Sequence, residues 1–451
     1  MDASSRRLAL TLSGLFFLMF FPQGAILTAA FTFLARPPAA GGLGLTPAQV
    51  SMVAAAGAIG NLAAIGLVHR LRAFACRRVL ATLFSCAAVV TGLLAAFAGA
   101  NATAASAAAS GVSVGATYGV VAAICVCFGC FTAVSSAGSA SAATFIQQCI
   151  AGTGLSYYRL RSAGTLGFVC GGASLLTVTP VSTQPLWLGC GALLVAAAYA
   201  LLALPLTGES AVAGNQPRAV HARSGGPGAF PRNEFAFVLV LLGATAILGR
   251  LYDAYGNQFL TEFKFPYPCA TQPLLAQFPE FLLLLLVPFA SLRARYCLIL
   301  GPLAWVCVYF GFACGDRFDM GWAIYLTLPM QAGNCIMQTT ASITIDAMFE
   351  RSRFRRTAQA ALPFALGAGV LLGSLLAGAI VSAATMLAGK TNWNHVWLVG
   401  SSAALVVTAL TGAAIAVLPM DRFKKREARA ERPHCGAAMG LESIAEAVVD
   451  V

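Results

Sequence analysis

The sequence predicts an all-α membrane protein with twelve transmembrane helices. Of its 451 residues, 59% are hydrophobic and 10% are charged, which is too apolar a composition for the core of a water-soluble protein. The hydrophobic residues gather into twelve long runs, most of them about 20 residues or longer, which is the length a helix needs to cross a bilayer. The alternating pattern of a transmembrane barrel strand is absent, so the spans are expected to be helices.

Six of these runs form a predicted N-terminal half, residues 1–205. They lie at residues 8–34, 46–69, 79–100, 112–150, 162–182 and 186–205. The first run follows Arg6 and Arg7, as a secretory signal would. Its length and the lack of a clear small-residue cleavage site before Arg36 predict a retained helix. The fourth contains three cysteines in ICVCFGC with no histidine partner, and we interpret them as small hydrophobic residues.

The other six runs form a predicted C-terminal half, residues 234–420. They lie at residues 234–260, 271–292, 297–314, 319–349, 357–386 and 395–419. A Gly-, Pro-, Ser- and Arg-containing interval at 206–233 predicts a flexible linker loop between the halves. Small residues at spacings near four in LGAGVLLGSLLAGAIV (366–381) predict close helix packing. The basic tail at 421–451 is interpreted as a solvated anchor near anionic lipid headgroups.

The positions of the basic residues predict the topology. Of the 28 lysines and arginines, 23 fall in the termini or in alternate loops on one side of the membrane. Only Arg36, Lys264, Arg317 and Lys390 fall in the opposite loops. By the positive-inside rule, both termini are expected in the cytoplasm. This distribution accounts for the net charge of +12 without a nucleic-acid partner, and merging or splitting any run would destroy it.

Three charged residues inside the predicted spans are the first candidates for function. Arg250 and Asp253 lie three positions apart in GRLYDAYGNQFL, and Glu280 lies in QFPEFLLLLL. Asp253 and Glu280 have similar expected depths, roughly 10–14 Å from the outer boundary, so the three side chains are expected to meet. A charge in the bilayer is costly and is a functional candidate by default, although an ion pair that only fixes helix packing is the alternative.

A cluster of two acids and one base suits proton coupling. One acid can take up a proton while the other stays paired with the arginine, so Asp253 and Glu280 are the proton-coupling candidates. Gln277 lies one helical turn before Glu280 and is expected to face the same cavity. For other intramembrane amides, among them Gln331, Asn334 and Gln338, cavity lining and interhelical hydrogen bonding both remain open.

Several stretches from the fifth to the twelfth predicted span resemble the bacterial nucleoside:proton symporter family, the NupG-like branch of the major facilitator superfamily. They are SYYRLRSAGTLGF (156–168), YGNQFL (255–260), AQFPEFLLLLLVPF (276–289), LAWVCVYFGFACGD (303–316), RTAQA (356–360) and TNWNHVW (391–397). The resemblance implies two six-helix halves that rock around a solute held near the middle of the membrane, which agrees with the six-plus-six division of the runs.

The resemblance also implies site residues. RSAGTLGF supplies Arg161, Thr165 and Phe168 at the spacing of the family's nucleoside contacts, and QFPE supplies Gln277 and Glu280. The chain departs from the family pattern at two places. Arg250 and Asp253 stand where the family has a glutamine and an asparagine, and GNCIMQTTAS (333–342) lacks the family's coupling aspartate. We therefore expect Arg250 and Asp253 to join the substrate site and Asp253 to replace the lost acid.

These observations predict a transporter that imports nucleosides by alternating access, coupled to protons, in the cytoplasmic membrane. A sugar or oligosaccharide symporter of the same superfamily and a non-transporting membrane sensor or scaffold are the alternatives. An enzyme is not expected, because the four histidines form no metal-ligand cluster and no nucleophile has a plausible base. The expected partners are the nucleoside, the proton and the lipid bilayer, with no cofactor, metal or nucleic acid, and the protein is expected to be a monomer.

Overall fold

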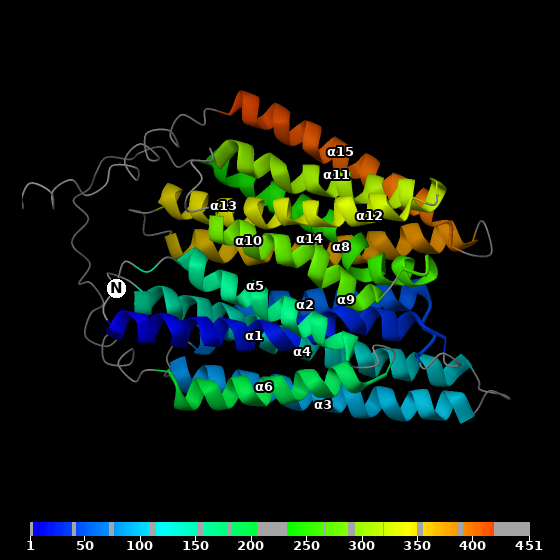
Figure 1. The fold of residues 1–451 in the computed structure, drawn as a ribbon, viewed down its shortest axis with the longest axis horizontal. Coiled ribbons are helices and arrows are strands. Elements are labelled where there is room, and N and C mark those ends of the chain that lie inside the picture. Colours follow the sequence, from blue (N-terminus) through cyan, green and yellow to red (C-terminus); the bar gives the residue numbers. More distant parts are fainter. Residues whose placement is uncertain are drawn as a thin grey trace, which may run out of the picture.

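The computed structural model is a bundle of long helices that run along one common direction (Figure 1). It describes residues 3–37, 42–71, 76–107, 114–150, 155, 157–177, 182–204, 232–265, 267–286, 294–318, 320–349, 355–386 and 391–418. The predicted linker, apart from its last two residues, and the predicted tail lie outside these residues, so the domain boundaries drawn there stay predictions.

Six helical segments make up the N-terminal half. They are α1 (Ala3–Ala35), α2 (Pro47–Leu71), α3 (Cys76–Ala107), α4 (Val114–Ile150), α5 (Tyr157–Ala173) with the short turn η2 (Ser174–Leu176), and α6 (Gln184–Leu202). In this half α3 and α6 lie together at the outer edge of the bundle, and α1, α2 and α5 lie toward the other half (Figure 1).

Six further segments make up the C-terminal half. They are α8 (Arg232–Glu262), α9 (Pro268–Gln272) continued by η3 (Pro273–Gln277) and α10 (Phe278–Leu286), α11 (Ala294–Phe318), α12 (Gly321–Thr327) continued by η5 (Leu328–Gln331) and α13 (Ala332–Phe349), α14 (Arg355–Met386) and α15 (Trp393–Val417). The prediction of twelve membrane-crossing segments is confirmed. Ten of the described segments are long and apolar enough to span a membrane by themselves.

Two of the segments are broken in the middle, which the hydropathy pattern did not predict. The segment expected at 271–292 contains a π-helical turn at Pro273–Gln277, and the segment expected at 319–349 contains a 3-10 turn at Leu328–Gln331. Each break begins at or next to a proline, which cannot donate the backbone hydrogen bond that a regular helix needs. The two irregular turns pack against one another, so the breaks lie at the same level of the C-terminal half.

Glycines of α14 allow this helix to lie directly on α8. A Cβ atom at Gly369 would meet the Gly243 carbonyl oxygen, and one at Gly373 would lie 2.7 Å from the Ile247 carbonyl oxygen. This confirms the close packing predicted for 366–381. It also matters for the site, because Gly373 brings the backbone of α14 within reach of Arg250.

A tyrosine of α8 ties the C-terminal half to the start of α2. The Tyr255 hydroxyl donates to the Pro47 carbonyl oxygen at 2.7 Å, and the Ser51 hydroxyl lies 2.7 Å from the same phenolic oxygen. Because the Tyr255 hydrogen is used on Pro47, Ser51 is the donor to Tyr255. The side chain of Tyr255 is fully buried, so these bonds form in an environment where water does not compete for them.

Two more contacts join α1 to the C-terminal half at the same end of the bundle. The buried Asn257 donates from Nδ2 to the Thr28 carbonyl oxygen at 2.7 Å, and the Cys269 thiol lies 3.7 Å from the Thr32 hydroxyl. Together with the Tyr255 bonds, they close the two halves against each other where α1 ends, α2 begins and α8 ends. We name this region the end junction.

We expect Tyr255→Phe to loosen the end junction, because it removes both hydrogen bonds of the phenol. Each bond contributes about 1 kcal/mol, so losing both should raise the opened population up to roughly thirtyfold. The native Cys269, 3% exposed at the junction, is the reporter: its maleimide labelling rate in detergent, followed by peptide mass spectrometry, should rise severalfold. The buried Cys297 of α11 is the internal control and should not change. Equal labelling of Cys269 in both proteins would show that the tyrosine does not close the junction.

Candidate functional site

The first group of candidate residues joins α5 of the N-terminal half to α10 of the C-terminal half. The Thr165 hydroxyl donates to Glu280 Oε1 at 3.1 Å. Thr165 is 3% exposed and Glu280 is half-buried, so this bond to a carboxylate lies inside the bundle. Glycines of α5 let it lie directly on α1, as Gly167 does against the Phe17 carbonyl, and this packing sets Thr165 at the boundary between the halves.

Arg161 lies one helical turn before Thr165 on α5. Its guanidinium carbon is 4.3 Å from the centre of the Phe20 ring, a cation–π contact with α1. Its Nη1 atom is buried and, among the residues that the structure describes, has no hydrogen-bond partner. Since α5 begins at Tyr157, Arg161 is within the helix rather than before the span predicted at 162–182. A buried cationic donor without an acceptor is a natural contact for a polar solute.

The remaining residues predicted from the family, Gln277 and Phe168, lie within one helical turn of Glu280 and Thr165 along the chain. Gln277 is half-buried at the end of the π-helical turn, and Phe168 is half-buried on α5. The Cys335 thiol of α13 lies close enough to interact electrostatically with both Glu280 and Arg161, and it is 3.9 Å from the Thr339 hydroxyl. The sequence does not mark Cys335 as a site residue, and only the packing of α10 against α13 reveals it as a neighbour of Glu280.

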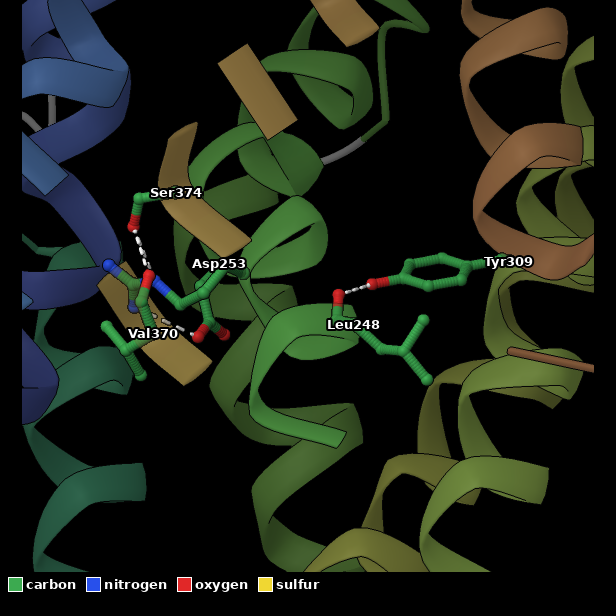
Figure 2. Close-up of polar contacts among 6 residues, drawn as sticks. Leu248, Asp253, Tyr309, Val370 and Ser374 are labelled. Atoms are coloured by element: carbon green, nitrogen blue, oxygen red, sulfur yellow. Dashed lines mark hydrogen bonds and ion pairs between the residues drawn. The ribbon is translucent and has the colours of Figure 1, made fainter. Parts of the chain in front are cut away.

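The second group lies on α8 and α14. Arg250 Nη1 donates to Asp253 Oδ2 at 3.2 Å, which is the ion pair expected from their spacing of three residues. Arg250 Nε donates to the Ser374 hydroxyl of α14 at 3.3 Å, and Ser374 donates in turn to the Val370 carbonyl oxygen at 2.8 Å. Figure 2 shows Asp253, Ser374 and Val370 together on one side of α8.

Arg250 also faces the N-terminal half. Its guanidinium carbon is 5.9 Å from the centre of the Phe31 ring of α1. The two charged side chains are unequally covered, because 42% of the Asp253 side-chain surface is accessible but only 15% of that of Arg250. The Asp253 side chain is therefore the more accessible one of a pair that lies between the halves.

Aromatic residues hold the opposite side of α8. The Tyr309 hydroxyl donates to the Leu248 carbonyl oxygen, and Figure 2 shows it across the helix from Asp253. Tyr309 is stacked between Trp305 and Trp397, with ring centres 5.6 and 5.7 Å away. Tyr252 packs on Trp305 in this core and is 1% exposed. The aromatic core keeps α8 fixed so that its charged face is presented to α1 and α14.

The structure separates the residues that the sequence was expected to bring together. Among the described residues, no hydrogen bond or ion pair joins Glu280 to Arg250 or Asp253. Glu280 faces α5, whereas the ion pair faces α14 and α1. Similar depth in the membrane therefore did not imply contact. The shared neighbour is α1, which contacts one group through Phe20 and the other through Phe31.

Comparison with solved structures identifies the class of fold. The crystal structure of the nucleoside transporter NupG matches this chain with a TM-score of 0.67 at 17% identity, over 90% of this chain and 98% of NupG. A mutant of NupG matches with a TM-score of 0.68 at 19% identity, over 90% of this chain and 99% of its own. A proton-dependent oligopeptide transporter has a TM-score of 0.64 at 13% identity, covering 93% of this chain and 100% of its own. The fold is that of these transporters. No curated protein sequence matched the chain.

The family follows from the sequence itself. The model of the nucleoside H⁺ symporter family matches residues 6–418, nearly the whole chain. The protein belongs to the nucleoside H⁺ symporter family, and it is accordingly a multi-pass membrane transporter and not an enzyme.

We expect Thr165→Val to weaken nucleoside binding while preserving the shape of the side chain. The substitution removes the donor that holds the Glu280 carboxylate. A hydrogen bond to a charged group contributes about 1.5–3 kcal/mol, so a carboxylate that is no longer held should bind the nucleoside about tenfold more weakly. Thr165→Ser keeps the hydroxyl and is the matched control. The KM for nucleoside uptake should rise about tenfold in the valine variant and little in the serine variant. Similar KM values for all three proteins would remove Thr165 from the site.

Proposed function

We propose that the protein imports nucleosides across the cytoplasmic membrane by alternating access and that the proton gradient drives this import. Membership of the nucleoside H⁺ symporter family supports both the solute and the driving ion. The observation that carries the proposal is the Thr165–Glu280 hydrogen bond, a polar contact between the two halves at a place where such folds hold their solute. No finding favours a sugar symporter or a non-transporting scaffold.

The residues of α5 and α10 are assigned to the nucleoside. Glu280 and Gln277 offer acceptors and donors for ribose hydroxyls and for the polar edge of a base. Arg161 supplies the buried Nη1 that has no acceptor among the described residues, and Phe168 offers an aromatic face for the base. Arg250 and Asp253 are assigned to the same solute from the α8 side, where the family pattern has amides.

Asp253 is assigned as the proton carrier in place of the acid missing from α13. Its side chain is 42% accessible, and a bond from Arg250 Nη1 connects the carboxylate to its counter-charge. Adding a proton to this carboxylate would remove the charge attraction of the pair and leave Arg250 with an unpaired charge between the halves. Proton binding would thus change what the protein offers to a solute, which is the requirement for coupling. Glu280 is the second candidate for the proton.

The orientation follows from the distribution of basic residues, with both termini in the cytoplasm. In that orientation the end junction of Tyr255 and Asn257 lies on the outer side, and this conformation is closed to the outside. Import requires the opposite conformation as well, so the hydrogen bonds of the junction must break and re-form in each cycle. We assign the working unit as a monomer, since each chain contains both halves and the boundary between them.

We expect Asp253→Asn to uncouple transport from the proton gradient, because asparagine cannot gain or lose the proton. In proteoliposomes, an inward proton gradient should stimulate uptake of radiolabelled adenosine or uridine by the wild type several-fold and should no longer stimulate it in Asp253→Asn. Glu280→Gln is the companion variant, in which uptake should fall through a raised KM while the gradient still stimulates what remains. If gradient stimulation survives in Asp253→Asn and disappears in Glu280→Gln, the proton belongs to Glu280.

A further inference from the structure

Ser374 is a helical hydroxyl that accepts a hydrogen bond from a charged group. Many serines and threonines here donate to the carbonyl oxygen four residues earlier, as Thr91 does to Ala87 and Thr408 to Ala404. Such a bond satisfies the donor and is common in membrane helices. Ser374 makes this bond to Val370 and in addition accepts a hydrogen bond from the charged Nε of Arg250. Its side chain is completely buried.

The bond to Ser374 constrains the arginine at the base of its guanidinium. Arg250 uses Nε for Ser374 and Nη1 for Asp253, and neither bond uses Nη2. The donor of Ser374 is already directed to Val370, so its oxygen is turned toward Arg250 rather than free to rotate. Close packing of α14 on α8 supports this arrangement, because a Cβ at Gly373 would lie 3.0 Å from Arg250 Cγ.

We infer that Ser374 is a positioning residue that keeps Arg250 directed toward the solute when Asp253 takes up its proton. This inference rests on the proposed function. With Asp253 charged, the arginine has two fixed partners. With Asp253 neutral, the bond through Nη1 weakens, and the Ser374 bond and the Phe31 ring remain. The guanidinium then stays in place with Nη1 and Nη2 available for oxygen acceptors of a nucleoside, such as a base carbonyl or a ribose hydroxyl.

The charged and titratable surroundings of Asp253 are compatible with this exchange. Arg250 on α8, together with Tyr252 on α8 and Tyr309 on α11, interacts electrostatically with Asp253. From α14 the contact with the pair is the uncharged Ser374, and from α1 it is the uncharged Phe31 ring. Arg250 is therefore the cation whose position depends on the charge of Asp253, and Ser374 is what limits its movement.

The test is the dissociation constant of adenosine or uridine for the purified protein, measured with and without Ser374→Ala in two backgrounds. In the wild-type background Asp253 also holds Arg250, and we expect Ser374→Ala to raise the dissociation constant about threefold. The Asp253→Asn background imitates the protonated acid. There Ser374→Ala should raise the dissociation constant about tenfold or more, because Ser374 is then the remaining hydrogen-bond partner that holds Arg250. If Ser374 served packing alone, Ser374→Ala would raise the dissociation constant by the same factor in both backgrounds.

Controls separate the inference from folding and from the proposed function. Ser401→Ala removes a comparable buried hydroxyl of α15, bonded at 3.4 Å to the Val306 carbonyl oxygen, and should leave nucleoside binding unchanged. Ser374→Thr keeps the hydroxyl and should bind close to wild type; Ser374→Cys, with a weaker acceptor, replaces the alanine variant if that one does not fold. Equal factors in both backgrounds would overturn the role of Ser374 alone. A wild type that binds no nucleoside would overturn the proposed function together with this inference.

Discussion

The cost of placing charge in hydrocarbon shapes this protein more than any other physical constraint. A charged side chain at the centre of a membrane helix costs about 2.5–3.5 kcal/mol even on insertion scales, and lipid offers it no hydrogen-bond partner. Arg250 and Asp253 avoid this cost by neutralising each other, and Ser374 and the Phe31 ring surround the cation. The pair lies at the boundary between the halves, where its neighbours are the Phe31 ring of α1 and the Ser374 hydroxyl of α14.

The same constraint explains why polar contacts lie on the inward-facing sides of the helices. Outward-facing side chains must be apolar, as Leu372 and Leu376 of α14 are, so polar groups are left to the inner faces. There they form the Thr165–Glu280 bond and the end junction, which join helices of different halves. Contacts of this kind hold one conformation and can be exchanged for others when the halves move. An apolar boundary would lack such directional contacts.

The sequence predicted the fold well and the site only in part. Apolar length predicts a membrane helix directly, and the Arg250–Asp253 pair follows from a spacing of three on one helix. The breaks at Pro273 and Pro329 were missed because a broken helix has the same hydropathy as a straight one. The separation of Glu280 from the ion pair depends on how each helix is rotated about its axis, which depth does not reveal. Ser374 lies in a stretch that the sequence marks only for helix packing. Its contact with Arg250 could not be predicted, because the sequence does not show that α14 faces Arg250.

We propose that a proton carried by Asp253 moves with the nucleoside. The most direct measurement is of the proton itself: liposomes that contain the protein and a trapped pH indicator are given an outside excess of nucleoside with no initial pH difference. We expect the wild type to acidify the interior as nucleoside enters and Asp253→Asn to admit nucleoside without acidification. Nucleoside entry through the wild type with no change of internal pH, or unchanged acidification by Asp253→Asn, would contradict it.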